Sequence, residues 1–435
     1  MIKIVGAKLT DGKVIDLEID NQVIVKIENS TNNLSKGAVD GSSKLLIPGL
    51  VDMHTHLREP GREDSETVLT GSRAAVAGGF TAVSTMANTN PVADNAGVVE
   101  QIFRLGKEAG LVDVNPIGAV TNGLNGEKLS EMGAMADSIA KVRIFSDDGK
   151  CVSDPLIMRR ALEYVKTFNG IIAQHAQEPR LTVNAQMNEG SVSARIGLPG
   201  WPAIAEEAII ARDILLAEHV QSRLHICHLT TAGGVELIRW AKQRGIQVTA
   251  EVTPHHLLLT DDLLENYDPI YKVNPPLRTQ KDVMALREGL ADGIIDIVAT
   301  DHAPHPSEDK DCEFHAGAFG MVGLETALSV VFKTMVETGL MSWSDLVDRM
   351  SIAPAKIAGY TTQGREIAVG MPANFILINP DQRWTVDKNK LKSKSKNTPF
   401  NGLELPAVVT DVFHNGEHVM KSGEILNIKA ASNER

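Results

Sequence analysis

Eight short apolar runs, separated by amphipathic helical stretches, constrain the fold of this 435-residue chain more than any other feature. The alternation of buried strands with helices is typical of βαβ units, whose strands lie parallel in one sheet. Eight such units predict an α/β fold of the closed (β/α)₈, TIM-like barrel type. The runs cover residues 46–56, 80–86, 114–120, 142–148, 170–175, 223–228, 247–256 and 295–302.

Both ends of the chain carry a different pattern, in which short apolar runs are separated by Gly, Asn and Ser. Such runs predict small strands joined by turns. We therefore expect one small β-sandwich domain built from both ends, with residues 1–47 and 364–435 flanking a barrel at 48–363. The Lys-rich stretch 388–396 is expected to be a solvated segment.

Most of the eight runs end in a side chain that can bind a metal. In a barrel these strand ends meet at one mouth, where the active sites of this fold lie. His54 and His56 are two residues apart on one strand, so their side chains point the same way. A His-x-His pair alone is as often an exposed or core pair, but four more ligand types follow on later strands. The expected ligands are His54, His56, Asp148, His175, His228 and Asp301.

Imidazole and carboxylate ligands without thiolate favour Zn²⁺, with Mn²⁺, Fe²⁺ and Co²⁺ as alternatives. Six ligands exceed the needs of one tetrahedral zinc with an open position. We therefore predict two zinc ions, about 3.5–4 Å apart and sharing a carboxylate. A single zinc, with the extra histidines contacting substrate, is the alternative. Asp148 is preferred as the shared carboxylate because it is nearer the loop, and Asp147 is its competitor.

Asp301 follows the last strand and could take a proton from an attacking water and return it to a leaving nitrogen. A helix N-cap is the ordinary role of such an aspartate. Arg58 and Asn88 stand at the same mouth, where they are expected to contact an anion. His305, Asn274 and the segment 318–320 are further candidates there.

Composition narrows the classes of partner. The chain has 43 Lys and Arg against 55 Asp and Glu, a net charge of −12, which argues against a nucleic-acid or anionic-membrane partner. Cys151, Cys227 and Cys312 are too few and too scattered for a disulfide framework or a CxxC zinc site. Charges spread through the first twenty residues, and the longest uncharged run, 74–93, is polar. We expect a cytoplasmic protein.

Several motifs together resemble bacterial dihydroorotases of the amidohydrolase superfamily, over nearly the whole chain. They are PGLVDMHTHLREPG (48–61), MANTNP (86–91), FSDDG (145–149), TAEVTPHHL (249–257), NPPLR (274–278), ATDHAPH (299–305), FGMVGLET (319–326) and NTPF (397–400).

The resemblance implies reversible conversion of L-dihydroorotate to N-carbamoyl-L-aspartate in pyrimidine synthesis. It implies zinc on the six ligands above, a metal-activated hydroxide that attacks the ring amide, and Asp301 as the general acid and base. It also raises a homodimer and an association with aspartate transcarbamoylase as expectations. The substrate contacts it implies are His56, Arg58, Asn88, Asn274, His305, Phe319 and Gly320.

Two departures and two rival functions accompany this resemblance. Related hydantoinases carry a carboxylated lysine where this chain has Asp148, and Lys150 leaves a lysine contribution open. The motif at 175–181, HAQEPRL, differs from the more familiar His-Cys-Glu-Asp. The rivals are another cyclic-amide hydrolase (dihydropyrimidinase, hydantoinase or allantoinase) and a non-catalytic paralogue that scaffolds aspartate transcarbamoylase. The segment between Asp301 and Phe319 is the expected mobile, substrate-contacting loop.

Overall fold

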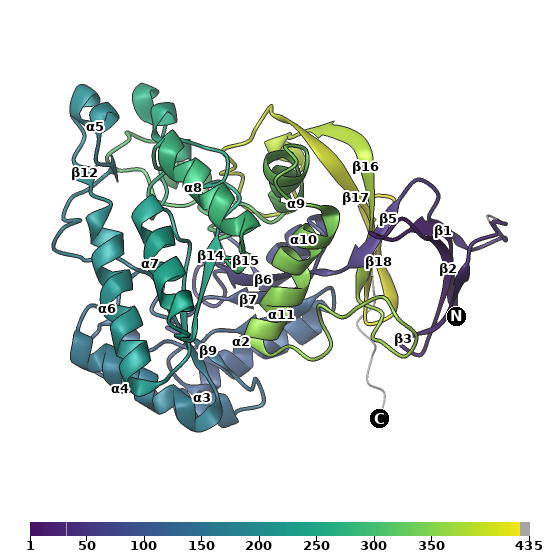
Figure 1. Ribbon diagram of the computed structural model, residues 1–435, viewed down its shortest axis with the longest axis horizontal. Helices are drawn as coiled ribbons and strands as arrows, with labels where there is room; N and C mark the ends of the chain where they lie inside the picture. Colours follow the sequence, from purple (N-terminus) through teal and green to yellow (C-terminus); the bar gives the residue numbers. More distant parts are fainter. Residues whose placement is uncertain (32, 427–435) are drawn as a thin grey trace.

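The computed structural model describes residues 1–31 and 33–426 and confirms the barrel (Figure 1). Neighbouring barrel strands pair in parallel ladders. Parallel bridges between Gly118 and Phe145 and between Thr55 and His302 close the ring. The strands are β6 (Leu50–Thr55), β7 (Phe80–Thr85), β8 (Asp113–Pro116), β9 (Ile144–Phe145), β10 (Ile171–Gln174), β13 (Leu224–Ile226), β14 (Val248–Val252) and β15 (Ile297–Val298).

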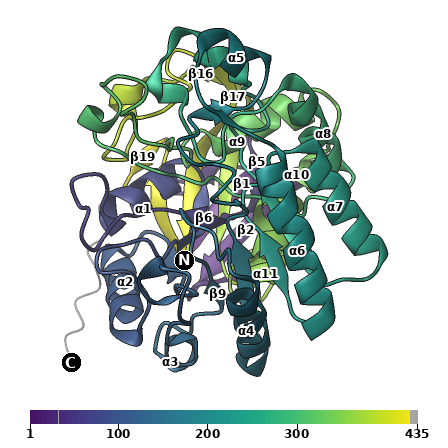
Figure 2. The same ribbon diagram turned by 90° about the vertical axis from the view of Figure 1, so that its left-hand side faces the viewer.

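Helices surround these strands (Figure 2). Several begin at a side chain that accepts hydrogen bonds from the first turn, as Asn95, Asp154 and Thr231 do. The longer helices are α1 (Val68–Ala77), α2 (Ala96–Ala109), α4 (Pro155–Val165), α6 (Ile204–Val220), α7 (Ala232–Gln243) and α8 (Gln280–Ala291). The shorter ones are α3 (Met132–Asp137), α5 (Ser191–Ile196), α9 (Ala327–Val331), α10 (Trp343–Val347) and α11 (Ala353–Ala358). Among the described residues, none of the helices combines the length and the apolar character needed to span a membrane.

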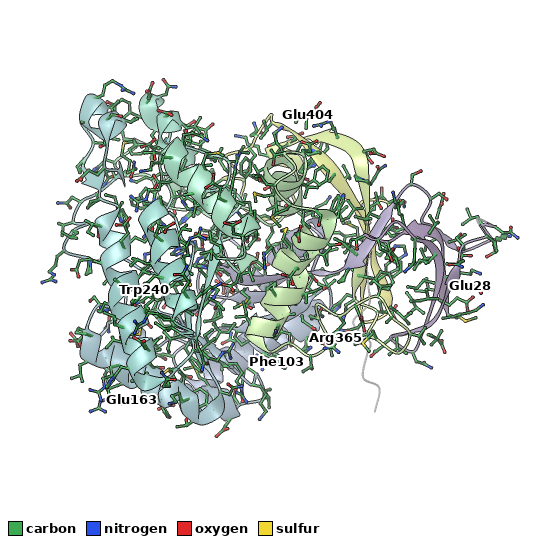
Figure 3. The ribbon with its side chains drawn as sticks, viewed as in Figure 1. Glu28, Phe103, Glu163, Trp240, Arg365 and Glu404 are labelled. Carbon is green, nitrogen blue, oxygen red and sulfur yellow. The ribbon has the colours of Figure 1, made fainter. Side chains whose placement is uncertain are left out.

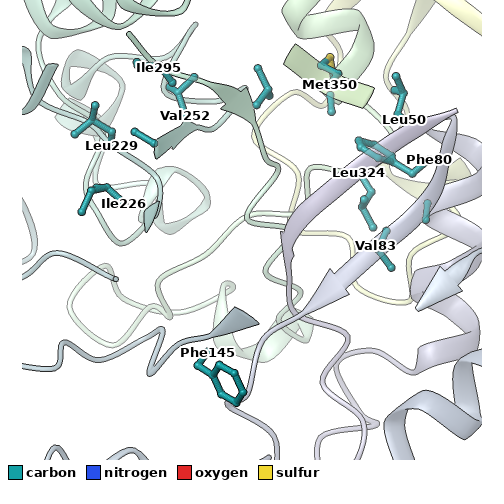
Figure 4. Close-up of a cluster of buried hydrophobic side chains, with 14 of the residues drawn as sticks. Leu50, Phe80, Val83, Phe145, Ile226, Leu229, Val252, Ile295, Leu324 and Met350 are labelled. Atoms are coloured by element: carbon teal, nitrogen blue, oxygen red, sulfur yellow. The ribbon is translucent and has the colours of Figure 1, made fainter. Parts of the chain in front are cut away.

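Two apolar layers hold the barrel together. The larger layer includes Leu50, Phe80 and Val252 and joins strands to helices (Figure 4). The smaller layer combines side chains from different barrel strands, among them Met53 and Ile171, and therefore fills the interior of the ring. Cys227 belongs to this inner layer and is 2% exposed.

Strands from both chain ends form one mixed sheet, named here the chain-end sheet. β5 pairs with β16 in antiparallel register and so joins the two ends. An apolar cluster that includes Leu17, Leu46, Phe375 and Phe413 lies against this sheet. The strands are β1 (Ile2–Lys8), β2 (Val14–Asp20), β3 (Val23–Asn29), β4 (Val39–Asp40), β5 (Leu45–Pro48), β16 (Phe375–Thr385), β17 (Glu404–His414), β18 (Glu417–Lys421) and β19 (Glu424–Ile425).

The predicted domain limits at 47/48 and 363/364 stay predictions, and residues 427–435 of the C-terminal part lie outside the described residues. The run 46–56, however, is two strands, with β5 in the chain-end sheet and β6 in the barrel. The strands separate at Gly49, where an added Cβ would lie 2.2 Å from Thr81 Oγ1. A side chain at that position would collide with β7.

The prediction of a solvated segment at 388–396 is wrong for part of its length. Ser393 and Ser395 are 1% and 5% exposed. The backbone N–H of Lys394 donates to Glu66 Oε1 at 3.0 Å, and that of Lys392 donates to Glu325 Oε1 at 2.7 Å. This segment satisfies two carboxylates near the barrel mouth, so its backbone cannot lie free in water.

Candidate active site

The barrel mouth, formed by the carboxyl ends of the barrel strands, brings the six predicted ligands together. Asp148 lies between two histidine pairs. Its Oδ2 is 3.5 Å from His54 Nε2 and 3.3 Å from His56 Nε2. Its Oδ1 is 3.3 Å from His175 Nδ1 and 3.1 Å from His228 Nε2. One carboxylate therefore faces both pairs, which is the geometry of a ligand shared by two cations.

Asp301 completes the cluster from the end of β15. Its Oδ1 lies 3.0 Å from His56 Nε2 and 3.5 Å from His54 Nε2. Ligand atoms of His54, His228 and Asp301 all lie within 4.8 Å of one another. The two aspartates are thus close enough to act on the same bound group.

The cluster fits a divalent metal on chemical grounds. Nε2 of His54 and Nδ1 of His228 are buried and lack a hydrogen-bond partner among the described residues. Burial penalises the charge of Asp148, but the surrounding histidines, His54 first, hold the pKa of its carboxyl well below the usual range. Partnerless imidazole nitrogens beside ionised carboxylates form a donor set suited to Zn²⁺.

Three ligand histidines have their other ring nitrogen fixed by a neighbour. Glu251 Oε1 lies 2.5 Å from His54 Nδ1, Asn88 Oδ1 lies 2.9 Å from His56 Nδ1, and Gln177 Oε1 lies 2.7 Å from His175 Nε2. Such bonds orient a metal-binding imidazole. In each of the three rings, the second nitrogen therefore points at the cluster.

Glu251 has the widest role among these neighbours, and sequence reasoning missed it. Its Oε2 lies 3.0 Å from His225 Nε2, and its Oε1 accepts from the backbone N–H of His228 at 3.2 Å. The available signal was a charged residue inside the apolar run 247–253, because an unpaired buried charge is costly. His225, three residues before His228, belongs to the same network.

Backbone strain also occurs at the mouth. Arg58, His228 and Asp301 have φ values of 63°, 31° and 46°, in the left-handed region that non-glycine residues seldom adopt. Each such residue costs on the order of 1–3 kcal/mol, which the surrounding structure must offset. The three strained residues are the predicted anion contact, Arg58, and two predicted ligands, His228 and Asp301.

Asp147 and Lys150, the alternatives to Asp148 as the shared ligand, lie outside the cluster. Asp147 Oδ1 accepts from the backbone N–H groups of Val120 at 2.8 Å and Thr121 at 2.9 Å, so that carboxylate is already satisfied. Lys150 is exposed.

His255 is fully buried near the ligands, its Nε2 lacks a partner among the described residues, and burial lowers its pKa to about 4.

The predicted substrate contacts gather beside this cluster. Arg58 is 8% exposed, its Nε donates to Pro304 O at 3.1 Å, and its Nη2 lies 3.4 Å from His305 Nε2. His305 Nε2 donates to Phe319 O at 2.9 Å. Burial and the Arg58 guanidinium lower the pKa of His305 to about 3. A permanent cation and a neutral imidazole therefore stand together at the mouth.

Gly320 shows why a small residue is required next to His305. Its φ is 145°, and an added Cβ would lie 2.8 Å from both Ala303 Cβ and His305 Nε2. The N–H of Gly320 donates to Lys272 O at 3.0 Å. Asn274, two residues beyond Lys272, has a buried Oδ1 without a partner among the described residues. That oxygen is free to accept a hydrogen bond from a ligand.

Hydrogen bonds of Lys310 and Asn397 hold the loop between Asp301 and Phe319 in place. Lys310 Nζ donates to the carbonyl oxygens of Pro269, Lys272 and Ala318 at 3.0, 2.9 and 2.6 Å. Burial and the Lys272 ammonium lower the pKa of Lys310 to about 7. Asn397 Oδ1 accepts from the N–H of His305 at 3.2 Å. A cavity of about 760 Å³ lies beside this loop.

Comparison with known proteins gives the following likenesses. The dihydro-orotase-like family matches residues 43–233. A dihydroorotase of Streptomyces coelicolor is 64% identical over 422 residues, which cover 97% of this chain and 98% of the relative. A dihydroorotase of Mycobacterium tuberculosis is 54% identical over 416 residues, covering 95% of this chain and 97% of the relative. An L-hydantoinase (dihydropyrimidinase) of Arthrobacter aurescens superposes with a TM-score of 0.87 over 99% of this chain and 98% of that chain, at 24% identity. This last likeness concerns the fold alone.

Proposed function

Because the chain belongs to the dihydroorotase family, we propose that it interconverts L-dihydroorotate and N-carbamoyl-L-aspartate in de novo pyrimidine (UMP) biosynthesis. It is a metal-dependent cyclic amidohydrolase. The observation that carries the proposal is the ligand cluster of Asp148 and Asp301 next to the buried Arg58. Hydantoin and dihydrouracil lack the carboxylate that such a cation would bind, which disfavours the rival cyclic-amide hydrolases. A scaffold without activity has no need of either feature.

The metal is assigned within this proposal to the six clustered side chains, with two Zn²⁺ as the expected content. The position of Asp148 between two histidine pairs supports two ions rather than one. The absence of thiolate from the predicted set supports zinc without excluding Mn²⁺, Fe²⁺ or Co²⁺. The ligands are His54, His56, Asp148, His175, His228 and Asp301.

Asp301 is the proposed general acid and base. When bound, the metal supplies Lewis acidity for the ring amide carbonyl and for the attacking water. Asp301 accepts the proton that water loses as its oxygen joins the carbonyl carbon, and delivers it to the ring nitrogen as the C–N bond breaks. His56 Nε2 lies 3.0 Å from Asp301 Oδ1, so the two side chains face the same bound group.

The substrate is oriented by the groups beside the cluster. Arg58, Asn88 and His305 are proposed to hold the ring carboxylate, because a guanidinium matches a carboxylate with two parallel hydrogen bonds. Asn274 and the backbone of Phe319 and Gly320 are proposed to bind the polar groups of the ring. Asn88 has a second task, since its Oδ1 already bonds His56.

The test is turnover of L-dihydroorotate, measured by the absorbance change that accompanies ring opening. Turnover is measured in the purified enzyme, after chelation of its metal, and again after zinc is restored. We expect turnover that chelation removes and zinc restores. Hydantoin, dihydrouracil and allantoin serve as comparison substrates. Absence of dihydroorotate turnover in a zinc-loaded sample would contradict the proposal, and turnover of one of the others would identify the rival.

A homodimer is part of the proposal. The association with aspartate transcarbamoylase and the cytoplasmic location stay predictions from the sequence.

A further inference from the structure

The connection between β16 and β17, residues 386–403, carries a buried asparagine at the barrel mouth. Glu404, labelled in Figure 3, marks the point where this connection rejoins the chain-end sheet. The connection contains the motif NTPF (397–400), to which the reaction proposed above assigns no task. Asn397, the first residue of the motif, is 4% exposed, although asparagine is mostly a surface residue. A buried amide needs partners for both its oxygen and its nitrogen.

The Asn397 amide finds these partners in the segment that carries His305. Its Nδ2 donates to Ala303 O at 2.9 Å, and its Oδ1 accepts from the backbone N–H of His305 at 3.2 Å. A carbonyl and an N–H two residues apart are the pair that one residue of a parallel neighbouring strand would bind. The side chain therefore takes the place of a strand and fixes Pro304 between its two hydrogen bonds.

Pro304 matters because its carbonyl oxygen holds the guanidinium that is proposed to bind the substrate. Arg58 Nε donates to Pro304 O at 3.1 Å. A shift of Pro304 would turn this guanidinium, and His305, the next residue along the chain, would move with it. Two of the proposed carboxylate contacts thus depend on the peptide segment that the Asn397 amide binds.

A third hydrogen bond extends the contact of Asn397 to the opposite side of His305. Asn397 Nδ2 also donates to Gly320 O at 3.2 Å, and the backbone N–H of Val322 donates to Asn397 O at 3.1 Å. Gly320 packs so closely that an added Cβ would lie 2.8 Å from His305 Nε2. The backbone of Gly320, another proposed substrate contact, is therefore tied to the same side chain.

The chain just before Asn397 is itself held to the barrel, so the amide has a fixed support. Ser395 Oγ donates to Ser65 O at 2.6 Å. One residue earlier, the backbone N–H of Lys394 donates to Glu66 Oε1 at 3.0 Å. Ser65 and Glu66 both belong to the loop that follows β6. Asn397 therefore connects the loop after β6 with the loop after β15.

We propose that Asn397 is a positioning residue for substrate binding, which orients Arg58 and His305 toward the ring carboxylate and holds Gly320 beside the ring. The inference rests on the proposed function, because it concerns the substrate assigned there. Asparagine suits this role since its amide combines two N–H donors with an acceptor. An aspartate of the same shape would turn an oxygen toward the carbonyl oxygens of Ala303 and Gly320.

Steady-state kinetics of Asn397→Ala with L-dihydroorotate test this role. We expect KM to rise by about 10–100-fold, because the substrate contacts lose their alignment, while kcat stays within about threefold of wild type. Asn397→Ser keeps a hydroxyl that can make one of the bonds, so its KM should lie between those of wild type and Asn397→Ala. Metal content and circular dichroism melting are measured on each variant, and the serine variant serves where the alanine variant does not fold.

Asn401→Ala is the matched control. Asn401 is exposed in the same connection, and its Oδ1 accepts from the backbone N–H of Lys388 at 2.9 Å. This variant removes an asparagine-to-backbone bond without altering the segments at the mouth, so its KM should equal that of wild type.

A double-mutant cycle with Arg58→Ala separates positioning from a general effect on the fold. In the Arg58→Ala background, Asn397→Ala should raise KM by a smaller factor than in wild type, because one contact that it orients is already gone, whereas independent effects multiply. Wild-type KM in Asn397→Ala and Asn397→Ser, or equal factors in both backgrounds, would overturn the proposed role. A wild-type enzyme that does not turn over L-dihydroorotate would overturn the proposed function, and this role with it.

Discussion

A carboxylate buried beside histidine occurs in two distant regions of this molecule, the chain-end sheet and the barrel mouth. In the sheet, Asp411 lies 2.9 Å from Lys44 Nζ and 3.0 Å from His418 Nε2, and Ser422 N–H donates to it at 3.4 Å. At the mouth, Asp148 lies among histidines that include partnerless ring nitrogens.

The difference separates a structural ion pair from a binding site. A buried polar group is normally hydrogen-bonded, so each exception needs a physical reason. The bonds of Asp411 close within the sheet and tie Lys44, from the N-terminal part, to the C-terminal strands. The free Nε2 of His54 lies 3.5 Å from both Asp148 Oδ2 and Asp301 Oδ1, and the proposed metal would complete it. Substitutions in the two regions should therefore have different consequences.

Asp301→Asn should have the largest effect on turnover. The amide cannot accept and return the proton, so kcat for L-dihydroorotate should fall by about 10²–10⁴-fold. Asp411→Asn, the matched change in the chain-end sheet, should leave kcat at the wild-type value. Steady-state kinetics with metal content measured on each sample provide the comparison. Wild-type kcat in Asp301→Asn would contradict its proposed role.

Arg58→Ala should lower kcat/KM for L-dihydroorotate by about 100-fold, mostly through KM, because a buried charge-assisted contact to the substrate carboxylate is lost. Arg62→Ala is the control, since the Arg62 side chain is 40% exposed and pairs with Asp309. Equal kinetics for Arg58→Ala and wild type would exclude a carboxylate contact at this residue.

Glu251→Gln should weaken metal binding by about 10–100-fold, because the neutral amide no longer fixes and polarises the His54 imidazole. Competition with a chelator, followed by metal analysis, measures the change. Glu325→Gln serves as a control, since Glu325 accepts from the backbone of the 392–393 segment and does not contact a ligand histidine. Unchanged metal retention in Glu251→Gln would assign that carboxylate to folding alone.

The barrel can be predicted from the sequence because the signals for its strands and helices lie within short stretches of the chain. Most of the apolar runs end at a polar residue, and parallel strands bring those ends to one mouth, so His175 and His228 could be placed near each other from the fold class. The partners of these residues could not be placed in the same way. Gln177 and Glu251 reach their histidines through side-chain geometry that no spacing rule contains.

Long-range contacts explain the remaining failures. The segment 388–396 is rich in lysine, which predicts solvent exposure, yet its backbone satisfies Glu66, 328 positions away, and Glu325, 67 positions away. Likewise, the split of one predicted strand at Gly49 follows from its close approach to Thr81 on another strand. Composition in a short window carries no information about either partner.

Asp411→Asn should lower the stability of the protein although it leaves turnover unchanged. The amide loses the negative charge and keeps one acceptor oxygen, so its NH2 group faces either Lys44 or His418, and the free energy of unfolding should fall by about 1–3 kcal/mol. Asp381→Asn, at an exposed position of the same sheet, should cause almost no change. Urea unfolding at neutral pH measures both variants. An Asp411→Asn protein as stable as wild type would mean that this pair contributes nothing to joining the two chain ends.

The smallest predicted effect is the pH dependence of the difference in unfolding free energy between wild type and Asp411→Asn. Burial raises the pKa of Asp411, but the bonds from His418 and Lys44 outweigh it and hold the pKa below the usual range. For a carboxyl with a lowered folded pKa, the stabilisation is present above the unfolded pKa, about 3.9, and is lost as the pH falls through the folded value. The gap in unfolding free energy between wild type and Asp411→Asn should therefore stay constant from about pH 5 to 8 and narrow below about pH 4. A gap that widens in acid would show that the carboxylate is not the stabilising form.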